Sequence, residues 1–90
     1  MEFVKRLSPS EAKYKYLGLN KKAIEDLPEK GQIFKLKFRN KTYSMKVNNK
    51  NCIMLTQLYY EYEFQPEDEV KITKKKDSSF ELVVNSVSSM

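Results

Sequence analysis

The chain has 90 residues, with 17 Lys and Arg against 12 Asp and Glu, a formal net charge of +5 and a pI near 9.3. Ninety residues suffice for one domain with a modest core, and the positive charge favours polyanionic partners. The chain has no histidine, the commonest general base and metal ligand, and its two glycines are too few for a phosphate-cradling loop. We therefore expect no enzymatic activity, no cofactor and no bound metal.

Cysteine usage and hydropathy bear on the compartment. Cys52 is the single cysteine, so no intrachain disulfide can form and a reducing compartment fits. Because Cys52 precedes Ile-Met-Leu, we expect it to be a buried small hydrophobe. The N-terminus lacks the apolar stretch of a signal peptide, and no run is long enough to span a membrane. We expect no membrane partner and a cytoplasmic location, nucleoid-associated in a prokaryote and nuclear in a eukaryote.

The first predicted elements are a strand and a short helix. Residues 2–7 are expected to form the strand. Ser8 as N-cap, Pro9 at the first helical position and Glu11 three residues after the cap form a capping-box pattern. Gly18 is expected to end this helix. An ordered loop with a single turn fits the same stretch equally well.

A second short helix is expected after a short strand over residues 17–19. Asn20 is a plausible N-cap, and the helix that follows it should end before Pro28. Gly31 then turns the chain toward the next strand. The second helix would place three apolar side chains on one face, namely Ala23, Ile24 and Leu27.

A hairpin is expected within a stretch that lacks acidic residues. Between Lys30 and Tyr60 there is no Asp or Glu, while seven basic residues occur. Residues 33–38 and 42–47 alternate apolar and polar side chains, and a two-residue turn at residues 40–41 would join them. The core face would then pair Phe38 with Tyr43, Leu36 with Met45 and Phe34 with Val47. The outer face would pair Arg39 with Thr42, Lys37 with Ser44 and Lys35 with Lys46.

The long stretch with basic and no acidic residues has two interpretations. Lysines on solvent-facing strand positions commonly serve solubility and discourage edge-to-edge aggregation. That explanation is sufficient for any single lysine here. It is weaker for the whole stretch, because ordinary surfaces intersperse both signs.

The second half of the chain is expected to be β-rich. Its predicted elements are a polar loop over 48–51, a buried strand over 52–55, a helical turn over 56–64, a strand over 70–72 and a closing strand over 80–84. The carboxylates between the last helical turn and the next strand lack the Gly and the spacing of a calcium loop and are expected to be solvated; they are Glu61, Glu63, Glu67, Asp68 and Glu69.

The whole pattern predicts one domain over residues 1–84, followed by a flexible tail over 85–90. About six or seven short strands with one or two short helices predict a mainly β (α+β) fold, namely a small open β-barrel.

Five stretches also resemble a known family in their order and spacing. They read Phe3-Val-Lys-Arg-Leu-Ser-Pro-Ser-Glu11, Leu17-Gly-Leu-Asn-Lys-Lys-Ala-Ile-Glu-Asp-Leu-Pro28, Phe34-Lys-Leu-Lys-Phe-Arg-Asn-Lys-Thr-Tyr-Ser-Met-Lys-Val47, Met54-Leu-Thr56 and Gln65-Pro-Glu-Asp-Glu-Val-Lys-Ile72. Together they resemble the DNA-binding pseudobarrel, specifically the B-three domain of plant transcription factors and of some restriction-enzyme recognition domains. Where that family has Gly-Trp before its aromatic turn, this chain has Gln57-Leu58 and no Trp, so a minimal or divergent member is implied.

The resemblance implies that two loops, residues 8–16 and 46–51, grip duplex DNA and reach into its major groove. Their chemistry fits this role, because lysines neutralise phosphates, hydroxyls bond phosphate oxygens and asparagine amides pair with adenine edges. For Asn48 and Asn49, turn formation explains the residue type equally well. The candidate DNA-binding residues are Ser8, Ser10, Lys13, Lys15, Lys46, Asn48, Asn49, Lys50 and Asn51.

Two alternatives remain open beside a double-stranded DNA-binding module, which would act as a transcription regulator or a recognition domain. One is a single-stranded nucleic-acid binder that uses tyrosines as stacking platforms; the expected inward position of Tyr43 counts against it. The other is a protein-interaction module that docks an acidic partner on the basic face, or a homodimer that uses the acidic segment 61–69. Salt-dependent binding to duplex and single-stranded DNA separates the three.

Overall fold

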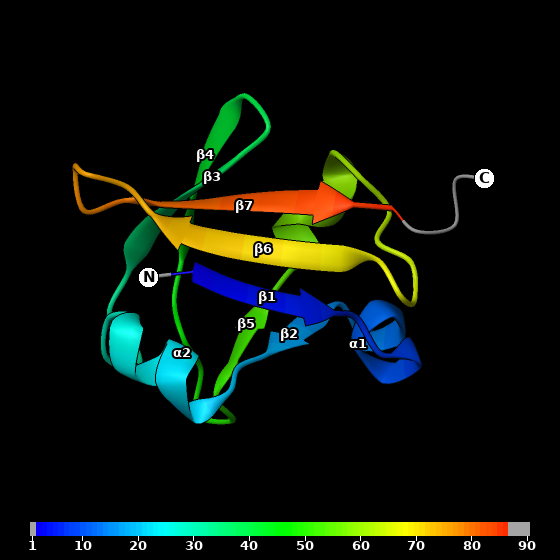
Figure 1. Cartoon of the computed structure of the whole chain (residues 1–90), viewed down its shortest axis with the longest axis horizontal. Coiled ribbons are helices and arrows are strands. Elements are labelled where there is room, and N and C mark those ends of the chain that lie inside the picture. Colours follow the sequence, from blue (N-terminus) through cyan, green and yellow to red (C-terminus); the bar gives the residue numbers. More distant parts are fainter. Residues whose placement is uncertain (1, 87–90) are drawn as a thin grey trace.

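A computed structural model describes residues 2–86 of the chain. In this part of the chain there are seven strands, two α-helices and one 3-10 helix (Figure 1). In chain order they are β1 (Glu2–Arg6), α1 (Pro9–Tyr14), β2 (Tyr16–Gly18), α2 (Lys21–Asp26), β3 (Phe34–Phe38), β4 (Lys41–Met45), β5 (Cys52–Met54), the 3-10 helix η1 (Thr56–Tyr60), β6 (Glu69–Lys74) and β7 (Phe80–Asn85).

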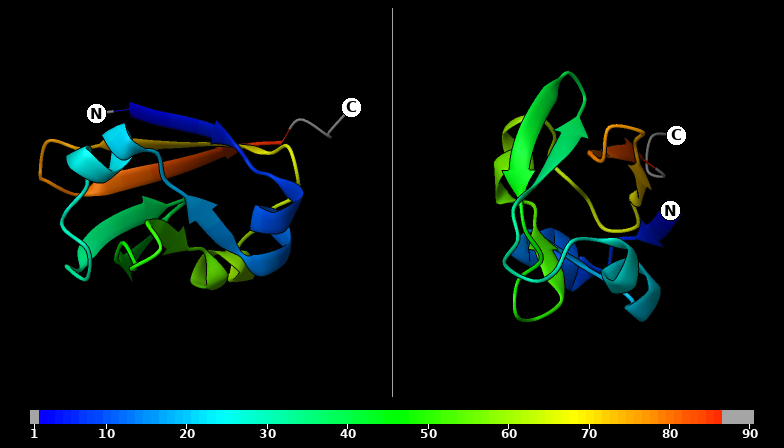
Figure 2. Two further views of the ribbon diagram at one scale, coloured as in Figure 1. Left: turned by 90° about the horizontal axis from the view of Figure 1, so that it is seen from below. Right: turned by 90° about the vertical axis from the view of Figure 1, so that its left-hand side faces the viewer.

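The strands form one large sheet and one small ribbon. The large sheet has five strands in the order β1-β6-β7-β3-β4, and the ribbon pairs β2 with β5. Only β3 and β7 run parallel; the other neighbours are antiparallel. The large sheet curls, so that β1, β6 and β7 lie on one side and the β3–β4 hairpin on the other (Figure 2). The expected small open barrel is therefore confirmed, as a curled open sheet that does not close.

The core lies between the curled sheet and the ribbon. Strand β3 alternates strictly between buried and exposed residues, as a strand with one face on a core does. The rings of Phe34 and Phe80 meet edge to face at 5.2 Å between centroids, and those of Phe38 and Phe64 stack at 5.7 Å. The ribbon and η1 close the core from the other side with Leu17, Ile53, Leu55 and Leu58, all at most 1% exposed.

The register of the β3–β4 hairpin differs from the expected one by two residues. The turn is formed by Arg39 and Asn40 rather than by Asn40 and Lys41, because Arg39 adopts the positive φ, 55°, that tight hairpin connections require. This turn places Lys41 in β4, and the Lys41 side chain forms an ion pair with Glu61. The expected pairs are wrong, and the observed ones are Phe34 with Met45, Lys35 with Ser44, Leu36 with Tyr43, Lys37 with Thr42 and Phe38 with Lys41.

The two-residue shift leaves every side chain on its expected face, because side chains on a strand alternate with a period of two. The lysines of β3 therefore still point away from the core. Lys35 lies opposite Ser44, not Lys46, and its Nζ donates to Ser44 Oγ at 3.2 Å. The repulsion expected between two directly opposed lysines is absent from this hairpin.

Helix α1 has the predicted start and a different end. Ser8 and Glu11 form the expected capping box. The helix ends at Lys15, whose φ of 61° puts it in the left-handed region, so the prediction that Gly18 ends the helix is wrong. Gly18 is instead the last residue of β2. The expected cap at Asn20 is confirmed, since its Oδ1 accepts from the N–H of Ala23 at 2.8 Å.

Two side chains differ from their expected exposure. Cys52 is only partly buried, and its Sγ lies 3.3 Å from the carbonyl oxygen of Lys50. Asp68, expected in a solvated acidic loop, is fully buried. Its Oδ2 accepts from the hydroxyl of Tyr62 at 2.7 Å and from the N–H of Gln65 at 2.9 Å, while its Oδ1 has no partner in the described part of the chain. The carboxylate is buried because the turn that carries it is bonded to the end of β1.

The described residues continue into the expected tail, residues 85–90. Asn85 pairs with Glu69 as the last residue of β7. Residues 87–90 lie outside the described residues, so the domain boundary at residue 84 and the flexible tail stay predictions.

Candidate nucleic-acid interface

The two predicted loops lie at opposite ends of the β2–β5 ribbon. The carbonyl of Lys15, at the end of the first loop, accepts from the N–H of Leu55 at 2.8 Å. At the other end, the carbonyl of Asn51 accepts from the N–H of Leu19 at 3.0 Å. Three residue pairs lie between these bonds, so Lys15 and Leu19 are four residues apart, about 14 Å at a strand rise of about 3.4 Å per residue. The ribbon therefore fixes the spacing of the two loops.

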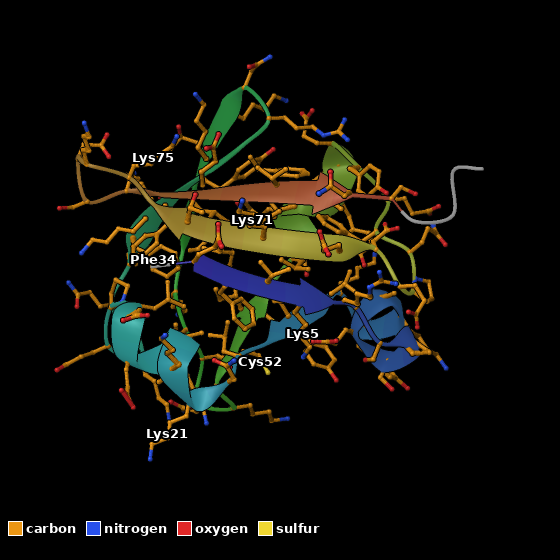
Figure 3. The ribbon with its side chains drawn as sticks, viewed as in Figure 1. Lys5, Lys21, Phe34, Cys52, Lys71 and Lys75 are labelled. Carbon is orange, nitrogen blue, oxygen red and sulfur yellow. The ribbon has the colours of Figure 1, made fainter. Side chains whose placement is uncertain are left out.

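The first loop is held by the carboxylate of Glu11, which is 2% exposed. Its Oε1 accepts from the N–H of Ser8 at 2.9 Å, and its Oε2 accepts from the N–H of Gly18 at 2.7 Å. The Nζ of Lys5 lies 2.7 Å from the same Oε2 and also donates to the carbonyl of Gly18 at 3.2 Å. Figure 3 labels Lys5 close to α1 and the ribbon. These bonds tie α1 to β1 and β2.

The ionisation of Glu11 follows from this environment. Burial by itself raises the pKa of the carboxyl, but the hydrogen bonds from Lys5, Ser8 and Gly18 and the charge of Lys5 outweigh it, and the pKa is lowered from its ordinary value. Glu11 is thus a charged anchor beneath the first loop.

The second loop is shaped by its own asparagines. Asn48 Oδ1 accepts from the N–H of Lys50 at 2.9 Å and from that of Cys52 at 3.0 Å. Asn51 has a positive φ of 60°, and its Oδ1 is buried without a partner in the described residues. For Asn48 and Asn51 these bonds and angles give the residue type a structural reason. Asn49 is exposed and free of such bonds within residues 2–86.

A hollow of about 420 Å³ lies over the ribbon between the two loops. The first loop contributes Tyr14 and Tyr16, the second Asn48 and Lys50, and β5 its outward side chains Cys52 and Met54. Tyr14 is 60% exposed and Met54 45%. The structure thus brings part of both predicted loops to one surface.

The lysines of the first loop lie around a second hollow, of about 560 Å³, which Lys13 and Lys15 line together with Tyr59 and Tyr60. The Nζ of Lys15 lies 5.3 Å from the ring centroid of Tyr59, within cation–π range. Tyr60 is 89% exposed. Tyr60 was not among the predicted residues, because the sequence of this aromatic run does not show which ring points outward.

The other predicted residues divide into engaged and free side chains. Ser8 acts as the N-cap, since its Oγ accepts from the N–H of Glu11. Four polar side chains are exposed and have no hydrogen bond or ion pair within the described part of the chain, namely those of Ser10, Lys46, Asn49 and Lys50. These side chains are available to a ligand without breaking any bond of the fold.

Residues 2–86 contain neither a cluster of metal ligands nor a membrane-spanning helix. No group of three or more His, Cys, Asp or Glu side chains is arranged to hold a metal ion. No helix is long and apolar enough to cross a membrane.

Comparisons with solved structures identify the fold. The Arabidopsis FUS3–DNA complex superposes with a TM-score of 0.76 at 18% identity, over 96% of this chain and 97% of that one. The N-terminal domain of Helicobacter pylori LlaJI.R1 gives 0.72 at 9% identity, over 98% and 89%. A hypothetical protein of Arabidopsis thaliana gives 0.63 at 13% identity, over 96% and 90%.

No family model matches the sequence, and no curated protein matches it significantly. The likeness therefore resides in the three-dimensional arrangement, which covers nearly the whole chain in each comparison. The resemblance seen in the order of sequence elements is confirmed at the level of the fold: the chain has the B-three-like pseudobarrel fold.

Proposed function

We propose that this chain is a non-catalytic module that binds double-stranded DNA across its two loops, in a transcription regulator or a recognition domain. The observation that carries the proposal is the pair of loops at the ends of one ribbon, with exposed, unpartnered Lys46, Lys50 and Asn49 on one loop and Lys13 and Lys15 on the other. The FUS3 relative, solved in complex with DNA, and the net charge of +5 support it.

The dimensions of the ribbon suit a duplex. The distance of about 14 Å between its two ends is close to the width of the major groove, about 12 Å. Loops at its two ends can therefore reach the two backbones that border the groove. Lysines would neutralise phosphates there, and the free amide of Asn49 would pair with the edge of an adenine.

The dependence of DNA affinity on salt concentration tests the proposal. Neutralisation of phosphates by about four to six side chains predicts a log–log slope of roughly −4 to −5 for binding of a random duplex. Replacing Lys13 and Lys15 by Ala should weaken binding to all sequences and reduce the magnitude of that slope by about 2. Replacing Asn49 by Ala should weaken binding only to a preferred DNA sequence, by about 1–3 kcal/mol of binding free energy.

A matched control removes two positive charges elsewhere. Arg6 and Lys71 lie at outward positions of β1 and β6, on the outer face of the curled sheet, where Figure 3 labels Lys71. The double Ala variant of these two residues should change the slope by much less than the Lys13/Lys15 variant. Equal effects of the two variants, or an unchanged salt response after Lys13, Lys15, Lys46 and Lys50 are all removed, would contradict binding across the loops.

One observation favours single-stranded DNA as a second candidate ligand. Tyr60 and Tyr14 are strongly exposed, and Lys13 and Lys15 lie beside them. Exposed aromatic rings beside cations are the chemistry of a stacking platform, worth about 1–3 kcal/mol per base. Replacing Tyr60 by Ala should then weaken single-stranded binding and leave duplex binding unchanged. A third outcome is that this chain binds neither duplex nor single-stranded DNA more tightly than a neutral protein does. That result would indicate that the basic surface binds an acidic protein.

A further inference from the structure

A second lysine surface lies away from the first loop. It consists of Lys35 and Lys37 on the outer face of β3 and of Lys74 and Lys76 at the β6–β7 turn, all four of them exposed. Figures 1 and 2 show this turn at one end of the long axis and α1 near the other end, and Figure 3 labels Lys75 at the turn. The longest extent of the described chain is 35 Å. The surface is thus spatially separate from the first loop.

Three of the four lysines line one depression. A hollow of about 590 Å³ is lined by Lys37, Lys74 and Lys76 together with the turn residues Asp77 and Ser79. Lys35 and Lys74 line the neighbouring hollow, of about 430 Å³. The ammonium groups around these two hollows are donors that phosphate oxygens accept.

The turn that carries two of these lysines is fixed by hydrogen bonds. The N–H of Lys75 donates to the carbonyl of Ser79 at 2.7 Å, and the N–H of Ser78 donates to the carbonyl of Lys75 at 3.2 Å. Asp77 Oδ1 accepts from both the N–H and the hydroxyl of Ser79, at 3.0 and 2.5 Å. The lysines therefore project from an ordered turn, so that little backbone freedom is lost when a ligand binds.

The local carboxylates do not neutralise the surface. Glu81 is engaged by Lys75 at 2.8 Å, and Asp77 is bonded within its turn. Lys35, Lys37, Lys74 and Lys76 have no carboxylate within ion-pair distance in the described residues. Asp26 also lines the hollow beside Lys35 and Lys74. Five lysines against three carboxylates still leave an excess of positive charge in one small area, which attracts a polyanion.

We propose that Lys35, Lys37, Lys74 and Lys76 form a second site for a nucleic-acid phosphate backbone. Lys35 and Lys37 are two residues apart on one strand, so their Cα atoms are separated by about 6.8 Å. Phosphates of one DNA strand advance by about 3.4 Å along the axis and rotate about it, so that successive phosphates lie about 7 Å apart in space. The two lysines therefore match neighbouring phosphates. The turn lysines then contact the same backbone beyond β3. The proposal does not require that the two loops bind DNA.

The experiment separates the second surface from the loops. In a background with Lys13, Lys15, Lys46 and Lys50 replaced by Ala, we expect residual duplex binding with a log–log salt slope of about −3 to −4, from four phosphate contacts at 0.9 each. Affinity should fall about 150-fold between 50 and 200 mM salt. Adding Ala at Lys35, Lys37, Lys74 and Lys76 should abolish this binding. The charge-matched control replaces four other basic residues by Ala in the same background, namely Arg6, Lys21, Lys22 and Lys71. This control should retain the residual duplex binding.

The outcomes distinguish this site from the proposed function. Residual binding that survives loss of the second surface, or that the charge-matched control also abolishes, overturns the site whatever the loops do. Loss of all binding in the second-surface variant of the otherwise wild-type protein, with no effect of the loop variant, supports the site and contradicts DNA binding by the loops. Competition by polyglutamate as effective as competition by duplex DNA also overturns the site, because it indicates an acidic protein partner.

Two sources of the phosphate backbone remain, and both support the site. If the second surface binds the flank of the duplex held by the loops, the wild-type salt slope steepens when the duplex is lengthened from about 10 to 30 base pairs. If it binds another duplex, donor- and acceptor-labelled short duplexes show energy transfer in the presence of the protein. The second-surface variant should lose whichever of these signals the wild type gives.

Discussion

Replacing Glu11 by Gln should destabilise the whole fold, because this carboxylate joins three elements. It accepts from the N–H groups of Ser8 and Gly18 and from Lys5. A glutamine keeps only one acceptor oxygen, so one backbone N–H would face an NH₂ group and lose its hydrogen bond. This loss should lower the free energy of unfolding by about 1–3 kcal/mol. The lost ion pair adds at most about 1 kcal/mol, because the Lys5 side chain is 36% exposed and solvent screens it. We expect a total of about 1–4 kcal/mol, a large fraction of the roughly 5–13 kcal/mol typical for 90 residues.

The effect of Glu11 should depend on pH in a defined direction. Its pKa is lowered in the folded protein from an ordinary value of 4.5, so the ionised form stabilises the fold. This stabilisation is fully present above pH 4.5 and is lost as the pH falls through the lower folded value. The difference in unfolding free energy between wild type and Glu11→Gln should therefore shrink as the pH falls below 4.5.

Urea unfolding followed by circular dichroism at pH 7, 5, 4 and 3 measures this difference. Glu25→Gln is the matched control, because Glu25 is an exposed glutamate in the other short helix, and it should change stability by less than about 0.5 kcal/mol. A Glu11→Gln effect as small as that of the control at pH 7, or one that stays constant down to pH 3, would refute the anchoring role.

Three other substitutions test local features of the fold by the same unfolding measurement. Gly18→Ala should destabilise by about 1 kcal/mol, because its Cβ would lie 3.1 Å from Lys5 Nζ and 3.3 Å from Glu11 Oε2; unchanged stability would show that these atoms move freely. Arg39→Gly should be more stable than Arg39→Ala by about 1 kcal/mol, since both lose the contact over Tyr62 and only glycine relieves the φ of 55°; the reverse order would contradict a strained turn. Asp68→Asn should cost roughly 1–3 kcal/mol by weakening the bonds from Tyr62 and Gln65, and a neutral result would show that the buried charge is unimportant.

Local signals in the sequence were sufficient for the helix starts. The caps at Ser8 and Asn20 form between residues three apart, so the sequence contains all the information they need. The end of α1 was not predictable in this way. Lys15 takes the left-handed conformation while Gly18 is needed for close packing beside Lys5 and Glu11, and that packing depends on a strand distant in sequence.

The hairpin shows the same division between local pattern and tertiary context. Alternation fixes which face of β3 is buried, and that prediction is confirmed. The turn position is not fixed by alternation. No glycine marks it, and Arg39 adopts a positive φ. Lys41 forms an ion pair with Glu61, the residue that follows η1. The parallel pairing of β3 with β7 is a further constraint that a local reading of the hairpin does not contain.

The candidate site was predictable in its position and less so in its details. The order of elements located both loops, and the ribbon that joins them follows from the same order. The direction of each side chain does not, because Lys13 and Lys15 line a different hollow from Tyr14 and Tyr16. The burial of Asp68 was also hidden, since a cluster of acidic residues suggests a solvated loop until the turn is seen bonded to β1.

The observed register also changes the reason for considering an anion at the outer face of β3. Two lysines held directly opposite each other would have favoured a bound anion to offset their repulsion. In the structure Lys35 and Lys37 face Ser44 and Thr42, so the hairpin requires no ligand to be stable. The excess charge arises instead where β3 approaches the β6–β7 turn and its lysines. A surface that is ordered without its ligand binds with little reorganisation, so we expect the wild type and the second-surface variant to have similar stability while differing in affinity for nucleic acid.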